Sequence, residues 1–255
     1  MHPRPEVLGV PMSALGMDDA IKAIDEWIRC GQRQYICTID VHALVESHFA
    51  SDVQDIYRSA AIAAPDGMPL VWLLRQSGYR TADRICGPDL MPEIFRASQT
   101  RGYRHFLYGS SEDTLLLLRQ QLARNFPGAE VVGHYSPPFR MLTRDEEREI
   151  DDLLNAAGPD IIWVGLGAPK QDRWMAAHRN TLNAPVLVGV GGAFEMLAGK
   201  VKRAPRIIRR TGCEWMFRLI QEPRRLSGRY LRSNFQFLMM LANQRWRSAR
   251  PIVDL

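Results

Sequence analysis

The chain contains 255 residues, of which 46% are hydrophobic and 24% are charged, and its formal net charge is +5. This composition can build a sizeable core and excludes a wholly disordered chain, while the lack of any run of about 20 apolar residues excludes a transmembrane helix. The four cysteines are scattered without a C-x-x-C pair, which argues against a zinc knuckle or a disulfide framework. Because no apolar signal-peptide segment follows Met1, we expect a cytoplasmic protein.

Helix and strand patterns alternate through the first part of the chain. Residues 13–31 carry apolar side chains at helical spacing, with Asp18 and Asp19 early and Gly31 as a stop. A β-prone run at 35–39 precedes a helical pattern over 42–59. A small apolar strand over 60–64 then ends at Pro65-Asp66-Gly67, so that strand carries a carboxylate at its carboxyl end.

The same alternation continues to residue 190. Strands are predicted at 104–108, 129–133, 161–164 and 185–190. Helices are predicted over 115–126, which Pro127-Gly128 terminates, and over 143–157, which a Thr143-x-x-Glu146 capping box opens. Strands that alternate with helices of this length predict an α/β fold, a Rossmann-like and mostly parallel sheet flanked by helices.

The pattern changes after Pro205, where two helical segments, 209–221 and 228–247, flank Glu222-Pro223. Residues 200–250 hold twelve arginines and two lysines against two glutamates. We therefore predict an α/β core over residues 1–205 and a basic helical C-terminal appendage over 206–255. The last helix has one apolar face flanked by arginines, and either of two roles fits that pattern: packing on the body, or contact with an anionic membrane surface.

Two glycine-rich loops follow predicted strands, Val164 to Gln171 and Val188 to Phe194. Because glycine has no Cβ, successive backbone N–H groups can approach an anion, which favours a nucleotide or sugar-phosphate site at the carboxyl edge of the sheet. Neither loop is the dinucleotide fingerprint, since its third glycine would fall at Lys170 or Phe194. The alternative is a pair of tight turns, and Pro169-Lys170-Gln171 favours the ligand site.

Asp66 is the first candidate for chemistry, as a general base at the end of a strand or, alternatively, as a turn residue before Gly67. Thr38 and Asp40 end another strand and could bind a sugar hydroxyl or cap a helix. The chain contains no Asp-x-Asp pair, the motif that often holds a divalent ion in nucleotide-sugar enzymes. We therefore expect no metal and no cofactor, with tail arginines neutralising a departing diphosphate.

These motifs together resemble the WecG/TagA/CpsF glycosyltransferases of bacterial cell-envelope and exopolysaccharide assembly. The matching stretches are Thr38, Pro65 to Pro69, Arg84 to Leu90, Phe106 to Gly109, Val164 to Gln171 with Trp174, Gly189 to Phe194 with Ala198-Gly199, Arg203 to Pro205, Glu214-Trp215, Arg218-Leu219 and Glu222 to Leu226. The resemblance implies an inverting, metal-independent enzyme. Such an enzyme passes a sugar from a UDP-sugar to a sugar on a polyprenyl diphosphate lipid.

The resemblance also assigns roles to residues, with the position of Asp66 as the general base. It implies substrate contacts from Thr38, Asp40, Arg84, Asp89 and Gln171. It implies nucleotide contacts from Gly109, Gly165, Gly167, Pro169, Lys170, Gly191, Glu195, Arg218, Arg225 and Arg229. Two departures stand out, because Asn is usual at Asp40 and an arginine pair is common where Gly228-Arg229 stands.

The partners expected from the resemblance are the UDP-sugar, the lipid-linked acceptor and an anionic membrane surface that the tail contacts. The protein would then lie peripherally on the inner face of the bacterial plasma membrane, with a possible homo-oligomer and no nucleic acid. Two functions of other classes stay open. The basic tail is also compatible with an RNA- or lipid-binding protein, and the glycine loops with a dinucleotide-dependent oxidoreductase.

Overall fold

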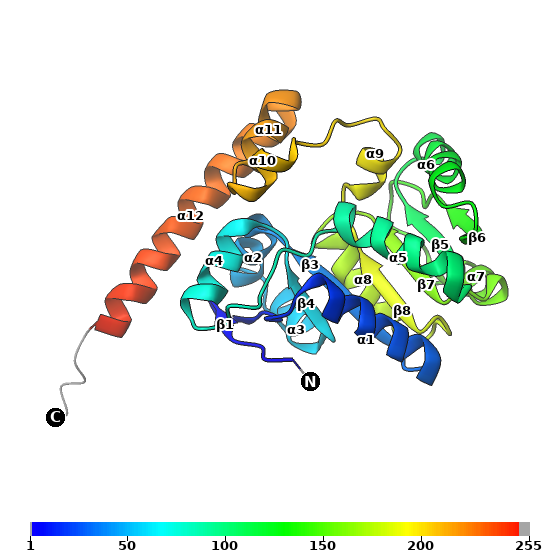
Figure 1. The fold of residues 1–255 in the computed structure, drawn as a ribbon, viewed down its shortest axis with the longest axis horizontal. Helices are drawn as coiled ribbons and strands as arrows, with labels where there is room; N and C mark the ends of the chain where they lie inside the picture. Colours follow the sequence, from blue (N-terminus) through cyan, green and yellow to red (C-terminus); the bar gives the residue numbers. More distant parts are fainter. Residues whose placement is uncertain (1, 250–255) are drawn as a thin grey trace.

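The computed structural model describes residues 2–249, without the side chains of Arg206, Arg210, Arg225, Arg229 and residues 244–249. Its centre is a six-stranded, all-parallel sheet with the order β4-β3-β8-β7-β5-β6 (Figure 1). The strands are β3 (Gln34–Ile39), β4 (Ile62–Pro65), β5 (Arg104–Gly109), β6 (Glu130–Tyr135), β7 (Ile161–Gly165) and β8 (Val186–Gly189). A small antiparallel hairpin, β1 (Glu6–Val7) and β2 (Val10–Pro11), precedes them. The predicted α/β fold with a parallel sheet is confirmed.

Helices cover both faces of the sheet because side chains alternate between the two faces along each strand. The face that carries Cys37 and Val164 packs against α2 (Val41–His48), α3 (Ser51–Ser59), α4 (Met68–Gln76), α7 (Arg144–Ala157) and α8 (Lys170–His178). The face that carries Ile36 and Trp163 packs against α1 (Met17–Cys30), α5 (Gly87–Arg101), α6 (Glu112–Asn125) and α9 (Ala193–Leu197). Each face therefore has its own buried apolar cluster.

The helical pattern predicted over 42–59 is two helices, α2 and α3. The chain leaves the helix at Phe49 and takes an extended conformation at Ala50, with φ −135° and ψ 95°. Leu44 and Val45 on α2 and Val53 and Tyr57 on α3 are all buried. Their spacing stays helical across the break, so periodicity alone could not locate it.

The C-terminal helices, α10 (Arg206–Arg210), α11 (Glu214–Gln221) and α12 (Pro223–Ala249), lie to one side of the sheet (Figure 1). The predicted helix over 209–221 is divided by Gly212, whose φ of 73° favours glycine. The last helix begins at Pro223 rather than at 228, since proline is well suited to a first helical turn. Among the described helices, none is long and apolar enough to cross a membrane. The division into a core and an appendage at residue 205 stays a prediction.

Helix α12 packs against α2 and α11 through one face. Leu226, Tyr230, Ser233 and Phe237 are buried at spacings of one helical turn, and His42 Nδ1 of α2 lies 2.7 Å from Ser233 Oγ. The opposite face exposes Leu231, Phe235, Leu238 and Met239. The helix therefore has both an inner face that contacts the body and an outer apolar face.

The ends of β5 and β7 approach each other so closely that one glycine is required by space as well as by conformation. A Cβ at Gly109 would lie 2.6 Å from the Gly165 carbonyl oxygen, and φ at Gly109 is 117°. We expect Gly109→Ala to lower the free energy of unfolding by roughly 2–3 kcal/mol, because the clash is with backbone that cannot rotate away. Denaturant unfolding measures this loss.

A matched control is Gly228→Ala in α12, where a Cβ would meet nothing within 4 Å. That substitution should leave stability unchanged or raise it by up to about 1 kcal/mol, since alanine is the better helix former. Equal unfolding free energies for the two variants would contradict the close packing of β5 on β7.

Candidate functional site

A cavity of about 1090 Å³ lies at the carboxyl ends of the parallel strands. The loops after β3, β4, β5, β7 and β8 contribute to its lining, and α11 and α12 contribute side chains from the other side. Open α/β sheets bind their ligands at this edge, where strand ends and helix starts converge. The volume lies at the upper end of the range of small-molecule and cofactor sites, about 300–1,000 Å³.

Asp66 stands at the wall of this cavity, directly after β4. Its backbone N–H donates to the Ile39 carbonyl at 2.8 Å, which fixes Asp66 beside the end of β3, and Gly67 then turns the chain into α4 with a φ of 138°. Burial raises the pKa of the Asp66 carboxyl to about 7, the nearby Asp40 carboxylate adds to the rise, and Arg84 and Arg218 oppose it. A carboxylate with a pKa near neutrality is well matched to general-base catalysis.

The raised pKa of Asp66 gives a pH dependence to any reaction that needs this base. Below about pH 7 the carboxyl is protonated and cannot accept a proton, so kcat/KM should fall about tenfold for each further pH unit. Above pH 7 the rate should level off. A profile of kcat/KM from pH 5 to 9 measures this, and a rate that stays constant down to pH 5 would contradict the assignment of Asp66 as the base.

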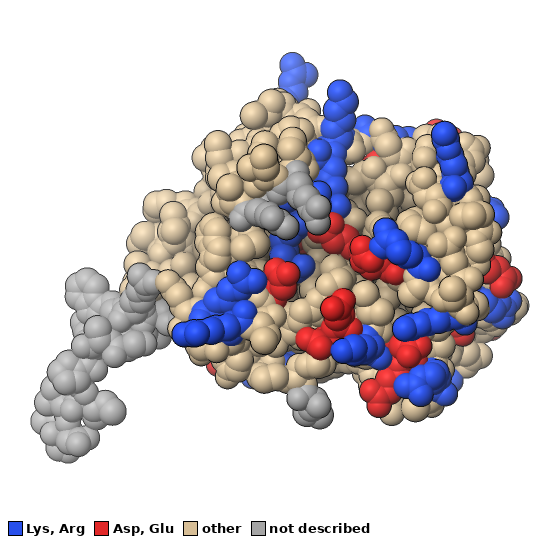
Figure 2. Space-filling model, viewed as in Figure 1, with Lys and Arg blue, Asp and Glu red and all other residues tan. Residues whose placement is uncertain are grey.

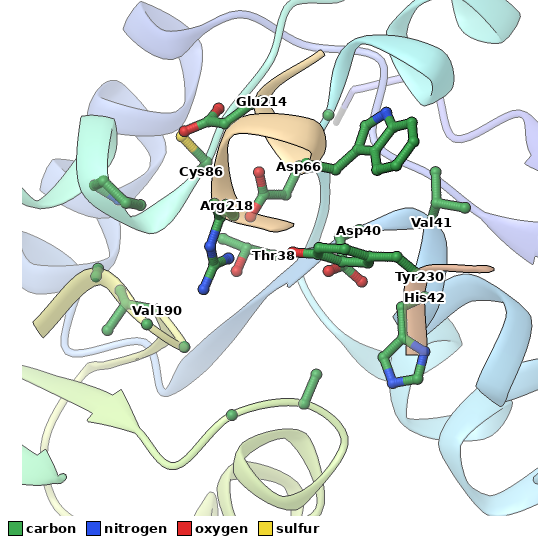
Figure 3. A pocket seen from close by; sticks show the side chains of 18 of the residues that line it. Thr38, Asp40, Val41, His42, Asp66, Cys86, Val190, Glu214, Arg218 and Tyr230 are labelled. Atoms are coloured by element: carbon green, nitrogen blue, oxygen red, sulfur yellow. The ribbon is translucent and has the colours of Figure 1, made fainter. Parts of the chain in front are cut away.

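Thr38 and Asp40 lie at the end of β3, beside Asp66 in Figure 3. The Thr38 hydroxyl donates to the Gly189 carbonyl at 2.9 Å, so its oxygen can only accept further hydrogen bonds, for instance from a sugar hydroxyl. Asp40 Oδ1 accepts from the Ala43 N–H at 2.7 Å and caps α2. Asp40 also lines the cavity, so this one residue both caps α2 and belongs to the site.

Gln171 ties the two glycine-rich loops together. Its Oε1 accepts from the Gly191 N–H at 2.9 Å and from the Gly167 N–H at 3.2 Å. The glycine pattern predicts that these two amides face an anion, and in the structure both donate to the Gln171 side chain instead. Gln171 therefore sets the shape of the cavity floor, and Lys170 beside it lines the cavity as a cation.

The wall formed by α9 and α11 combines an acid with an arginine. Ser110, with a φ of 59°, donates from its hydroxyl to Glu195 Oε1 at 2.8 Å. From α11, Arg218 reaches over the turn into α9, where a Cβ on Gly192 would lie 3.3 Å from Arg218 Nη2. Arg218 Nε is buried and has no hydrogen-bond partner among the described residues. This arrangement leaves a cationic donor available to an anionic ligand.

Asp89 joins the body to the C-terminal helices through arginines. Its carboxylate lies 2.6 Å from Arg84, 2.7 Å from Arg203 and 3.1 Å from Arg209 of α10. Arg84 also pairs with Glu214 of α11 at 2.6 Å. These contacts hold α10 and α11 against the cavity wall, near Asp66.

Comparison with known proteins identifies related sequences. Residues 5–251 match the model of the Glycosyl transferase WecG/TagA/CpsF family. The chain belongs to this family. It is similar to proteins of Bacillus spizizenii (33% identity over 170 residues), Bacillus subtilis (30% over 172) and Staphylococcus aureus strain MW2 (28% over 172). All three are named N-acetylglucosaminyldiphosphoundecaprenol N-acetyl-beta-D-mannosaminyltransferase.

The matches cover 67%, 68% and 68% of this chain and 64%, 65% and 66% of the three relatives. The chain therefore spans slightly less than two thirds of the length of each of these relatives.

The structure brings most residues assigned from the WecG/TagA/CpsF pattern to one cavity. Those that line it are Thr38, Asp40, Asp66, Arg84, Gly165, Gly167, Lys170, Gln171, Gly191, Glu195 and Arg218. Asp89, Gly109 and Pro169 are not among the described lining residues. For Arg225 and Arg229, the side chains fall outside the described part of the chain, and their assigned contacts stay predictions.

Several lining residues were not singled out for a role from sequence. Cys86, Glu214, Trp215 and Tyr230 also line the cavity (Figure 3 labels three of them). Glu214 and Trp215 lie within a stretch shared with the WecG/TagA/CpsF family, so the family pattern could have indicated them. Tyr230 looks like any buried aromatic of an amphipathic helix, and no sequence signal marks it.

The described residues include no group of three or more His, Cys, Asp or Glu side chains placed to hold a metal ion. The expectation that this WecG/TagA/CpsF member works without a metal stays a prediction. Arg218 and Lys170 are cationic side chains that line the cavity.

Proposed function

We propose that the protein transfers a sugar from a UDP-sugar to an acceptor sugar carried on a polyprenyl diphosphate, with inversion at the anomeric carbon. The relatives' name supports N-acetylmannosamine as the transferred sugar and N-acetylglucosaminyl diphosphoundecaprenol as the acceptor. The observation that carries the proposal is the position of Asp66, a carboxyl with a pKa of about 7 that lines the same cavity as Arg218.

The reaction needs a base, an electrophile and a stabilised leaving group. Asp66 removes the proton from the acceptor hydroxyl, whose oxygen attacks the anomeric carbon from the face opposite UDP. As the new C–O bond forms, the bond to the UDP oxygen breaks, and UDP leaves with the bonding electrons. Arg218 and Lys170 offset the negative charge that grows on the diphosphate. A single displacement of this kind inverts the anomeric configuration.

The C-terminal helices support a role at a membrane surface. Leu231, Phe235 and Leu238 expose more than half of their side-chain surface on α12, and Arg232 is exposed on the same helix. An apolar stripe flanked by arginines is typical of a helix that lies at a lipid interface. This proposal includes peripheral attachment to an anionic membrane. It also includes closure of Arg225 and Arg229 over the diphosphate, and a homo-oligomer.

Thermal unfolding with UDP, UDP-N-acetylmannosamine, UDP-glucose or NAD, each with and without EDTA, tests the donor class. A ligand that binds only the folded state stabilises it by about 2.7 kcal/mol at a hundredfold excess over Kd. We expect UDP compounds to raise the Tm with or without EDTA. An assay for transfer to a lipid diphosphate sugar then tests the acceptor.

The two alternatives predict different results. A dinucleotide-dependent oxidoreductase would show a Tm shift with NAD alone, although Lys170 and Phe194 occupy positions where its fingerprint needs glycine. An RNA-binding protein would bind nucleic acid with a steep salt dependence. On the face drawn in Figure 2, basic side chains are interspersed with acidic ones over the body, which is unlike a continuous nucleic-acid-binding surface.

A further inference from the structure

The cavity has a second arm that the transfer chemistry does not use. Its lining comes from three helices and is mostly apolar, with Val41 of α2, Met68, Trp72 and Leu73 of α4, and Phe237, Leu238 and Leu241 of α12. The same helices add the polar residues His42, Gln76, Ser233 and Asn234. We call this part of the cavity the α4–α12 groove. It is continuous with the polar arm that contains Asp66, because Asp66, Gly67 and Met68 are consecutive lining residues.

The packing of the helices explains why the groove stays open. Helix α12 packs on α2 and α11, and side chains of both α4 and α12 line the same cavity. Trp72 is held in place by the turn between α10 and α11, where a Cβ on Gly212 would lie 2.9 Å from the indole ring. Trp72 is nevertheless 46% exposed and Leu238 is 63% exposed. Covering apolar side chains of an open cavity with a hydrocarbon lowers the free energy, because their apolar surface is removed from water.

The continuity of the two arms restricts what can occupy the groove. An occupant that reaches the groove from the polar arm has a polar end beside Asp66 and Arg84 and a hydrocarbon end between α4 and α12. We propose that the α4–α12 groove binds the first isoprene units of the acceptor lipid, next to its diphosphate. This inference rests on the proposed function, and it adds a site for the lipid chain that meets the outer face of α12 at Leu238.

The dimensions and the outlet of the groove agree with this occupant. Lining residues on α4 run from Met68 to Gln76, which spans about 12 Å at 1.5 Å per helical residue. That length accommodates more than one isoprene unit. Leu238 lines the groove and is also exposed beside Met239 on α12. The groove thus opens next to the apolar surface that would face a membrane, where the remainder of the lipid would continue.

Binding of two isoprenyl diphosphates to the whole protein tests the groove without requiring turnover. Farnesyl diphosphate and dimethylallyl diphosphate share the diphosphate and differ only in chain length. By calorimetry below their aggregation limits, we expect farnesyl diphosphate to bind at least about tenfold more tightly, because each additional buried methylene is favourable. Equal affinities would overturn the proposal.

Variants then locate the preference for the longer chain. Trp72→Ala and Leu238→Gln, both at partly exposed positions that line the groove, should each reduce the affinity ratio at least about threefold. Leu231→Gln is the matched control, since Leu231 is 68% exposed on the same helix and is not among the described lining residues. If the affinity ratio of farnesyl to dimethylallyl diphosphate fell equally in Leu231→Gln, the assignment of the groove would be overturned. The same would follow if the groove variants changed only the oligomeric state, measured by sedimentation.

This experiment separates the groove from the proposed function. Suppose that the chain-length preference and its loss in the variants are observed while no UDP-sugar is transferred. The lipid site in the groove is then supported, and the proposed transferase function is contradicted. If transfer is observed with equal rates for acceptors with short and long chains, and the two isoprenyl diphosphates bind equally, the function stands and the groove fails.

Discussion

Asp66→Asn should lower turnover by about 10²- to 10⁴-fold at pH 8, the range typical for loss of a general base. The amide has nearly the same shape as the carboxylate but cannot take the proton from an acceptor hydroxyl. UDP affinity should change by no more than about twofold, because Arg218 and Lys170, the lining cations proposed to contact the diphosphate, are unchanged. Steady-state kinetics with saturating UDP-sugar and lipid acceptor, together with UDP titration, measure both quantities.

Stability separates loss of the base from loss of the fold. The folded-state pKa of Asp66, about 7, is above its ordinary value of 3.8, so the native state binds the extra proton between these values. The stability contributed by this group therefore declines as pH rises from about 4 to 7 and stays low above that. Asp66→Asn removes the buried charge, and its Tm at pH 8 should equal or exceed that of the parent.

Asp83→Asn is a suitable control, because Asp83 is exposed and pairs with Arg75 at 3.5 Å outside the described cavity lining. It should retain normal turnover. If Asp66→Asn also turned over normally, another group would have to be the base.

Arg218→Ala should lower kcat/KM for the UDP-sugar by about 10²- to 10³-fold, the loss typical when one donor to a developing charge is removed. Arg218 lies over the glycine turn before α9, and its Nε is buried without a partner among the described residues. A diphosphate in the cavity would offer anionic oxygens to this guanidinium. Donor kinetics and a UDP titration by calorimetry check the prediction.

Two further variants make the Arg218 result specific. Arg218→Lys should recover only part of the activity, because an ammonium cannot make the two parallel hydrogen bonds of a guanidinium. Arg232→Ala, at an exposed position on α12 outside the described lining, should leave the kinetics of a membrane-free assay unchanged. Similar losses for Arg218→Ala and Arg232→Ala would point to a general effect of tail charge rather than to a contact with the diphosphate.

The parallel sheet was predictable because each of its strands is a short apolar run followed by turn or polar residues. The positions of Asp66 and the glycine loops followed from the same rule, since the ends of parallel strands meet at one edge. Helices α4 and α5 were not predicted. Pro92 lies inside α5, and proline usually argues against a helix interior. Pro69 lies in the first turn of α4, where proline is tolerated.

The partners of particular side chains could not be read from the sequence. Gln171 was expected to contact a substrate, and it uses its carbonyl oxygen on two loop amides that are 4 and 20 residues away. Asp89 was expected to contact a substrate, and it binds three arginines, two of which are more than 110 residues distant. Contacts of this range depend on how the C-terminal helices meet the sheet, which local patterns do not specify.

The cavity is formed by residues from both ends of the chain, and this affects the order of folding. Thr38 lies near the end of β3 and Asp66 directly after the neighbouring strand β4. Arg218 and Tyr230 line the same cavity although they are more than 150 residues away in the sequence. Closing so long a loop costs entropy that only already-formed structure can offset. The sheet should therefore form early in folding and the complete site last, so that a newly made chain becomes capable of catalysis only after its final helices have docked.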